Sequence, residues 1–430
     1  MHRKLIAFII LLFVLFPSCY LLDIPFNTLT QPVREKNLSE LYNPAGIFLH
    51  PQSMVYHSGD SVSMLIISVL GSELMYVKQA NGTENTGKLR VSVRIYEKYP
   101  YNRFIDSTSI NYSINKSESN GIIPFYIPLK LKTLHKYNLH IMFLDQNRKK
   151  STQSFLYVDK MDRKSAQNFL LIDPLNRYPY FDQWFKTNDP IALRYPSTKV
   201  EQVFVDYYKY RFPDPAPPFS YSQNLVPKVD PDSTWRYKAS DSLIFVLPYE
   251  GMYRFRVDSL ATEGLMVFST SSSFPRIEYA RDFIDPLIYL TTSKEFERIK
   301  SAQIKKSELD YFWLKNAINA DIAKEIIRVY YNRVQLANVF FTAHNPGWQT
   351  DRGMIYIIFG PPHILYKNPA YEKWIYGTEG SAKAIVFVFD HSPNKYSNNN
   401  FSLRRDGSYT TVWRNAIDTW RAGKIFTAGK

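Results

Sequence analysis

Residues 347–362 read GWQTDRGMIYIIFGPP, and this stretch decides how the C-terminal third of the chain is expected to fold. Asn345-Pro346 stands just before it, and proline removes a backbone donor and disfavours helix in the preceding residue, so an upstream helix must end here. Residues 350–353 have the composition of a turn. The apolar run 354–359 (MIYIIF) predicts a strand, which Gly360-Pro361-Pro362 ends.

Helix and strand patterns flank this stretch. Before it, apolar residues recur at helical spacing. The predicted helices cover residues 293–303, 307–319 and 321–342. Residues 373–376 and 384–389 predict strands after it, and Trp413, Ile417 and Trp420 give a last helix an apolar stripe. Residues 285–425 are therefore expected to form an α+β domain.

The region before residue 285 has the pattern of two antiparallel sandwiches. Strand-like segments alternate with Gly, Asn, Ser and Pro clusters. They cover 61–70, 89–96, 122–129 and 137–144, then 190–195, 203–210, 243–247, 252–258 and 265–269. In each set a turn precedes a tyrosine, Tyr137 or Tyr253, an order typical of the tyrosine corner of an immunoglobulin-like sandwich. We expect tandem immunoglobulin-like β-sandwiches over 46–160 and 168–275, with one larger sandwich as the alternative. The proline-rich stretch 212–233 is expected to be a long loop.

Composition limits the class of protein and its partners. The chain is 45% apolar and 16% aromatic, with 32 Tyr and 29 Phe, which excludes a disordered chain and favours a mainly β fold. The net charge is +14, but the basic residues are scattered, with only short doublets such as Lys149-Lys150. We therefore expect a solvated basic surface that meets anionic lipid or cell-wall polymer, and no nucleic acid.

The first residues predict export. Residues 1–4 are positive, residues 5–16 are apolar and a Pro-Ser break follows, as in a secretory signal over residues 1–22. Cys19 is the only cysteine and follows a loose lipobox, so we expect lipidation there; an uncleaved anchor helix is the competing interpretation. Residues 23–45 are expected to be a tether. The absence of a second cysteine excludes an intramolecular disulfide.

The stretch around Gly347-Trp348-Gln349-Thr350-Asp351 resembles the GWxTD domain, a bacterial family named for this motif. Further matching positions are Arg352, Gly360, Pro361, Pro362, Trp374, Arg405, Asp406 and Trp413. Together with the helix 325–341 they cover about a third of the chain, which makes the resemblance specific. The resemblance implies a secreted or lipid-anchored envelope protein with a β-rich N-terminal part. It does not indicate which biochemical activity the domain has.

Two interpretations of the motif remain open. In the structural one, Trp348 and an ion pair between Asp351 and an arginine pin a helix-to-strand connection. In the other, Trp348, Asp351, Arg352 and His363 line a ligand cleft, where Trp348 and Trp374 stack on a sugar. Two weaker candidates are a metal site and a glycosidase-like carboxylate pair of Asp351 with Glu372 or Asp390. The metal candidate groups His344, His363 and His391 with Asp351 and Asp390.

Known catalytic signatures are missing from the sequence. It contains no GxSxG elbow, no HExxH pair and no phosphate-binding loop. We therefore expect a non-catalytic exported lipoprotein without a cofactor, anchored in the outer membrane and facing the periplasm, that binds or scaffolds envelope proteins. The alternative is a cell-wall glycan or peptide hydrolase with its cleft at the motif.

Overall fold

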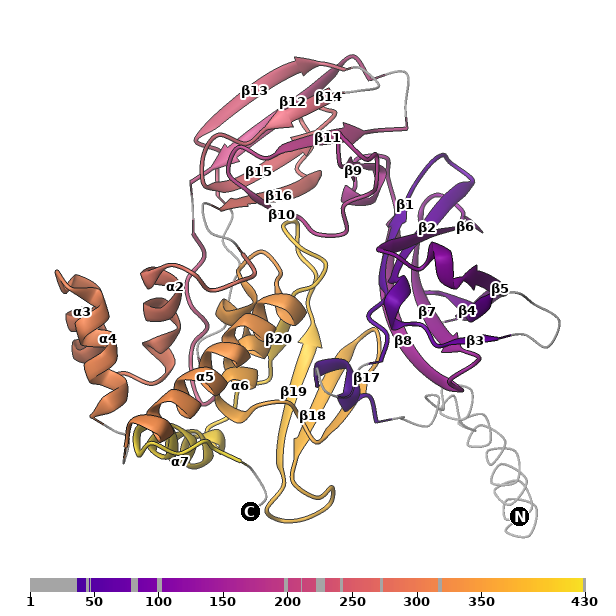
Figure 1. The fold of residues 1–430 in the computed structure, drawn as a ribbon. Helices are drawn as coiled ribbons and strands as arrows, with labels where there is room; N and C mark the ends of the chain where they lie inside the picture. Colours follow the sequence, from indigo (N-terminus) through magenta and orange to yellow (C-terminus); the bar gives the residue numbers. More distant parts are fainter. Residues whose placement is uncertain are drawn as a thin grey trace, which may run out of the picture.

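The computed structural model describes residues 37–427, except 44, 45, 47, 79–83, 99–102, 197–199, 210, 222–228, 240–242, 271–273 and 316–318. The expected signal segment, Cys19 and tether residues 23–36 lie outside the described residues. The architecture is mainly β with an α/β part at the C-terminal end, as the sequence predicts (Figure 1). Within the described residues, no helix is long and apolar enough to cross a membrane.

Two sheets enclose the core of the first sandwich. One has the order β1-β2-β6, with β1 (Gln52–Tyr56), β2 (Val62–Leu70) and β6 (Ile122–Lys130). The other has the order β3-β4-β7-β8, with β5 paired to β4. Its strands are β3 (Tyr76–Lys78), β4 (Asn85–Glu97), β5 (Arg103–Asn115), β7 (His135–Asp145) and β8 (Lys150–Lys160). Leu65 and Ile67 of the first sheet share one buried apolar cluster with Val91 and Leu139 of the second.

The second sandwich also has two sheets. The larger sheet contains, in order, β10 (Trp184–Lys186), β16 (Leu265–Thr270), β15 (Gly251–Arg256), β12 (Gln202–Tyr208) and β13 (Ser233–Lys238). The smaller contains β14 (Leu243–Val246), β11 (Pro190–Arg194) and β9 (Leu170–Ile172). Ile191 and Phe245 from the smaller sheet pack with Phe255 from the larger.

Both sandwiches contain the expected tyrosine corner. The Tyr137 hydroxyl donates to the Lys132 carbonyl at 3.2 Å and accepts from the Lys132 amide at 3.0 Å. The Tyr253 hydroxyl makes the same pair of bonds with Tyr249, each at 2.9 Å. Each tyrosine is buried and fixes the turn before its strand, β7 or β15.

Helices pack on a four-stranded antiparallel sheet in the C-terminal part (Figure 1). The sheet runs β17 (Ile364–Lys367), β18 (Tyr371–Tyr376), β19 (Ile385–His391), β20 (Phe401–Leu403). The helices are α2 (Ala280–Ile284), α3 (Ser293–Ser301), α4 (Lys305–Leu314), α5 (Ala320–Phe341), α6 (Asp351–Phe359) and α7 (Tyr409–Arg421). The strands predicted near 373–376 and 384–389 and the last helix are confirmed.

Residues 354–359 are helical, so the predicted strand is wrong. The Oγ1 of Thr350 accepts from the amide of Gly353 at 3.0 Å and caps α6. Gly360 ends the helix with φ at 82°, a left-handed conformation that favours glycine. Every residue of α6 is buried, so its sequence is apolar on all sides and shows no helical period. The motif therefore joins two helices, α5 and α6.

The end of the expected tether belongs to the C-terminal part. Residues Ser39–Tyr42 form the short 3-10 helix η2, and the Leu38 amide donates to the Leu365 carbonyl of β17 at 2.8 Å. Leu38 and Tyr42 are buried in the same apolar cluster as Trp374. The first described residues of the chain therefore complete the core of its last part.

Candidate functional site

The motif begins in a turn pressed against α5. Gly347 lies so close to this helix that a Cβ there would be 1.8 Å from the Ala337 carbonyl oxygen. A Cβ on Gly353 would lie 1.9 Å from the Gly347 carbonyl oxygen. The backbone of Trp348 accepts from the Tyr289 hydroxyl at 2.7 Å and donates to Asn338 Oδ1 at 3.1 Å. The two glycines thus allow a close approach of backbones that no side chain would permit.

Asp351 is paired with Arg405 inside the protein. Arg405 donates to both carboxylate oxygens, at 2.5 and 3.1 Å, and the Leu403 amide donates a third bond at 2.8 Å. Both side chains are buried. Arg405 also donates to the carbonyl of Ala216, in the proline-rich loop of the second sandwich, at 3.0 Å. The ion pair therefore ties α6 to β20 and to the second sandwich.

Arg352 points to a different carboxylate. Its guanidinium donates to Glu372 Oε1 of β18 at 3.0 Å and to Asn399 Oδ1 at 2.8 Å. The guanidinium carbon lies 4.1 Å from the centroid of the Phe401 ring. Asp351 and Arg352 are thus neighbours in sequence with separate partners.

Glu372 is the centre of a buried polar network. Its Oε1 accepts from the Tyr42 hydroxyl at 2.8 Å and lies 2.8 Å from Lys367 Nζ. Its Oε2 accepts from the indole nitrogen of Trp374 at 3.0 Å. Burial alone would raise the pKa of Glu372, but the adjacent Lys367 and Arg352 outweigh it and lower the pKa to about 2. Glu372 therefore stays ionised at neutral pH.

The proline-rich loop of the second sandwich packs on the motif. Gln349 donates to Asp214 at 2.7 Å, and the Asp406 amide donates to the Pro218 carbonyl at 3.1 Å. The ring of Phe212 contacts His344 edge-on, with centroids 4.6 Å apart. The hollow between this loop and Asp351 has a volume of only about 50 Å³. Among the residues that the structure describes, no open ligand cleft is therefore formed at Asp351.

The remaining predicted site residues have structural contacts. Trp374 and Trp413 are buried in the apolar core, so neither ring is available to stack on a sugar. The Asp406 carboxylate accepts from the Ser408 amide at the start of α7, and Gly360 lies against the Arg333 guanidinium. Pro361 and Pro362 follow Gly360 where the chain leaves α6. His363 accepts from the Gly377 amide at 2.8 Å.

The histidines and aspartates of the metal hypothesis are not brought together. Among the described residues, no group of three or more His, Cys, Asp or Glu side chains lies close enough to hold a metal ion. The His344 ring packs against Phe212 of the proline-rich loop and against Tyr396, and burial lowers its pKa to about 4. Sequence reasoning did not anticipate Tyr42 and Lys367, because no local pattern marks side chains that meet only in the folded chain.

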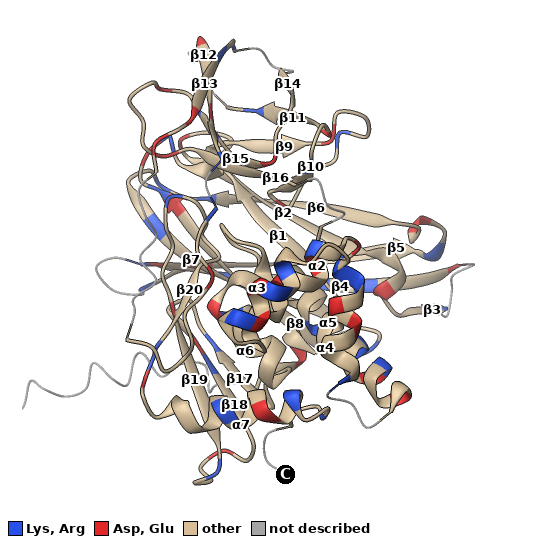
Figure 2. Cartoon of the chain, turned by 90° about the vertical axis from the view of Figure 1, so that its left-hand side faces the viewer, with Lys and Arg blue, Asp and Glu red and all other residues tan. Residues whose placement is uncertain are grey.

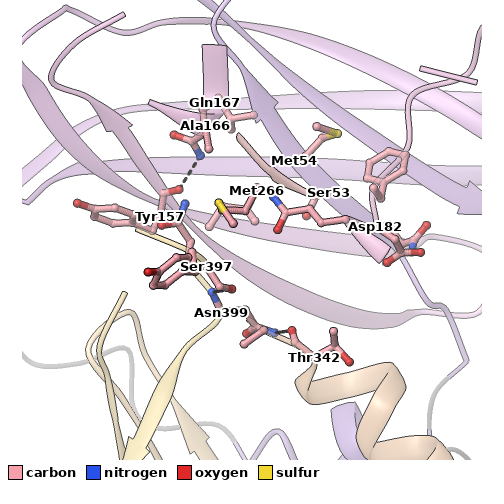
Figure 3. A pocket seen from close by; sticks show the side chains of 18 of the residues that line it. Ser53, Met54, Tyr157, Ala166, Gln167, Asp182, Met266, Thr342, Ser397 and Asn399 are labelled. Atoms are coloured by element: carbon pink, nitrogen blue, oxygen red, sulfur yellow. Dashed lines mark hydrogen bonds between the residues drawn. The ribbon is translucent and has the colours of Figure 1, made fainter. Parts of the chain in front are cut away.

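A larger cavity, of about 620 Å³, lies where both sandwiches meet the C-terminal part (Figure 3). Its walls include Ser53 of β1, Tyr157 of β8, Asp182 before β10 and Met266 of β16. Thr342 and Asn399, which contact the motif, form part of its lining. The sequence alone cannot reveal this cavity, because its walls come from segments far apart in the chain.

Comparisons with known proteins give one family and distant structural likenesses. No curated protein sequence matches the chain. A beta-glucuronidase of Bacteroides uniformis is 16% identical over 32% of this chain and 16% of its own, with a TM-score of 0.17. A red sea bream transglutaminase is 12% identical over 53% of this chain and 32% of its own, with a TM-score of 0.18. The chain thus spans less than a third of either protein, and both TM-scores are too low to indicate a shared fold.

The family match agrees with the motif. It begins at the first residue of β15, earlier than the expected domain start at 285, and it includes every element from α2 to α7. Residues 251–422 match the model of the GWxTD domain, and the chain is therefore a GWxTD domain-containing protein.

Proposed function

We propose that this protein is a non-catalytic component of the bacterial cell envelope, exported and anchored through Cys19, that binds or scaffolds envelope proteins. One observation carries the proposal: the charged side chains of the motif form buried contacts that connect α6 to other parts of the chain. Asp351 and Arg405 connect α6 to the second sandwich, and Arg352 and Glu372 connect it to the Tyr42 segment. The motif thus holds the modules together.

The chemistry of the motif argues against the hydrolase alternative. A glycosidase needs one carboxylic acid that holds a proton and one accessible carboxylate. Glu372 is fully buried, and its pKa of about 2, set by burial opposed by Lys367 and Arg352, leaves it without a proton to give. Asp351 is buried and held at both oxygens by Arg405. Neither carboxylate is placed to act on a substrate.

The surface charge is compatible with a scaffold near anionic envelope components. Figure 2 shows basic and acidic segments interspersed along α2 to α5. Exposed pairs such as Arg328 with Glu325 and Lys306 with Asp310 account for part of this mixture. A mixed surface of this kind does not favour the close phosphate contacts that nucleic acids require.

The test combines crosslinking in intact cells with an assay for hydrolysis. The full chain with a C-terminal tag is crosslinked, recovered and compared with a Cys19→Ala variant. We expect the wild type to bring a reproducible set of envelope proteins and to fractionate with membranes, and the variant to lose membrane association. Purified wild-type protein incubated with cell-wall sacculi should release no soluble glycan or peptide. Release of such fragments, or recovery of the protein alone after crosslinking, would contradict the proposal.

A further inference from the structure

The cavity between the three parts of the molecule is walled by edges of sheets. β1 and β8 are each the terminal strand of their sheet, and β10 is the terminal strand of the larger sheet in the second sandwich. Residues of all three strands line the cavity, including Ser53, Tyr157 and Trp184. An edge strand carries main-chain N–H and C=O groups that face away from its own sheet. The cavity therefore offers a row of main-chain hydrogen-bonding groups.

Gln167 shows which groups of β8 face the cavity. Its side-chain amide donates to the Tyr157 carbonyl at 2.9 Å and accepts from the Asp159 amide at 2.8 Å. Tyr157 and Asp159 thus direct their main-chain groups away from β7. The register between β7 and β8 is continuous, and in an antiparallel pair the main-chain groups of alternate residues point toward and away from the partner strand. The main-chain groups of Phe155 and the N–H of Tyr157 therefore also point away from β7. In the part of the chain that the structure describes, no strand pairs with this edge.

The carboxamide of Gln167 already behaves as a neighbouring strand would. It offers one donor and one acceptor to β8, in the positions that a peptide unit of an added strand would occupy. The Gln167 main-chain carbonyl accepts from the His57 amide, just beyond β1, at 2.8 Å. In Figure 3, Gln167 and Ala166 stand above Tyr157 at one side of the cavity. Beyond the part that Gln167 covers, the edge of β8 continues along the cavity wall.

The aromatic side chains of the cavity are less suited to a sugar. A sugar stacks on an open ring face, but Trp184 is stacked on both Phe268 and Phe274, each at 4.7 Å between centroids. Phe401 is stacked on His391 at 4.8 Å and lies under the Arg352 guanidinium. The amide of Asn399 is already bonded to Arg352 and to the Thr342 carbonyl. The edge of β8, in contrast, offers main-chain groups with which no described strand pairs.

The far side of the cavity contains a carboxylate. Figure 3 shows Asp182 at the side opposite Tyr157. The Asp182 side chain is exposed, and no described residue forms an ion pair or hydrogen bond with it, so its carboxylate is open to a cation. A basic side chain placed there would form a charge-assisted hydrogen bond with this carboxylate.

We propose that the cavity binds an extended peptide segment, which adds a strand to the free edge of β8 at Phe155 and Tyr157 and places a basic side chain at Asp182. The proposal rests on the proposed binding function and names the chemistry of the partner. Main-chain hydrogen bonds would supply affinity with little sequence dependence, and Asp182 would supply the selection for a basic residue.

The test uses two variants of one residue. The intact chain is immobilised and a displayed library of random short peptides is selected against it; recovered peptides are measured by fluorescence anisotropy. Tyr157→Pro removes the N–H that faces the cavity, a change that an edge strand tolerates, whereas Tyr157→Ala keeps the N–H and loses the same ring. We expect the proline variant to lose at least about tenfold in affinity and the alanine variant to stay near wild type. Thermal melts show whether both variants fold.

Two further readouts decide the outcome. Bound peptide should slow amide hydrogen exchange in residues 150–160, and Asp182→Asn should weaken a lysine-containing peptide but not its norleucine analogue. Failure to enrich any peptide, equal binding to the proline variant, or binding of cell-wall oligosaccharides instead would overturn the proposal. Cleavage of a bound peptide would contradict the non-catalytic function and leave the site in place, so the two failures are distinguishable.

Discussion

Tyr42 donates a buried hydrogen bond of 2.8 Å to Glu372, although 330 positions separate the two residues in the chain. A second hydrogen bond holds the same residue, because the Tyr356 hydroxyl of α6 donates to the Tyr42 carbonyl at 2.8 Å. The ring of Tyr42 lies 5.4 Å from that of Trp374. The segment that leads into the first sandwich is therefore packed into the GWxTD domain.

Replacing Tyr42 by phenylalanine should destabilise the GWxTD domain while keeping its packing. The change removes the hydrogen bond to the Glu372 carboxylate and the one that the hydroxyl accepts from Lys367 at 3.2 Å, and it keeps the ring, so we expect a loss of about 1.5–3 kcal/mol. Urea unfolding monitored by tryptophan fluorescence measures it. Tyr126→Phe is the control, because Tyr126 is 48% exposed. Equal unfolding midpoints for the two variants would show that the Tyr42 hydroxyl contributes nothing.

Adjacent arginines allow a direct comparison of a buried and an exposed ion pair. Arg405 with Asp351 is buried, whereas Arg404 with Asp390 is exposed, and both are bidentate. Asp351→Asn leaves the Arg405 charge without its partner, so we expect a loss of about 3–5 kcal/mol. Asp390→Asn should cost about 1 kcal/mol or less. Chemical denaturation measures both, and a small effect at Asp351 would mean that the motif does not hold the fold together.

Local patterns in the sequence predicted the sandwiches and most of the GWxTD domain. Tyr137 and Tyr253 were identifiable because a tyrosine corner is made within a few residues. The alternation of apolar residues in β7 and the apolar stripe of α7 are also local features. Each of these elements has apolar side chains on the one face that packs against a core, so its pattern can be recognised in the sequence.

Burial on all sides and long-range contacts were not predictable in the same way. α6 has nine residues, all buried, so its apolar run was indistinguishable from a central strand. The motif indicated that Asp351 would pair with an arginine, but not that Arg352 would pair with Glu372. The network around Glu372 also depends on the antiparallel pairing of β17 with β18, which brings Lys367 opposite Glu372. Such a network exists only once the sheet has formed.

Acid should weaken the protein through Glu372. Its pKa, with burial opposed by Lys367 and Arg352, is about 2 in the folded protein against an ordinary value of 4.5. A lowered pKa means that the stabilisation is complete above pH 4.5 and is lost as the pH falls toward 2. Glu295, whose pKa the Arg421 hydrogen bond lowers, acts in the same direction. Urea midpoints measured across this range should decline less steeply with acid in Glu372→Gln than in wild type or in Asp321→Asn, an exposed control. An unchanged slope in Glu372→Gln would contradict the assignment.

Alanine at Gly347 should disrupt the packing of the motif on α5. The new Cβ would lie 1.8 Å from the Ala337 carbonyl oxygen, and no side-chain rotation can relieve a contact with backbone. We expect a loss of about 3 kcal/mol or more, measured by thermal unfolding. Gly59→Ala is the matched control, because nothing lies within 4 Å of its Cβ, and it should change stability by less than about 1 kcal/mol. If Gly347→Ala melted with the control, the motif glycine would have a role other than close packing, and a ligand or partner contact at the turn would become the better explanation.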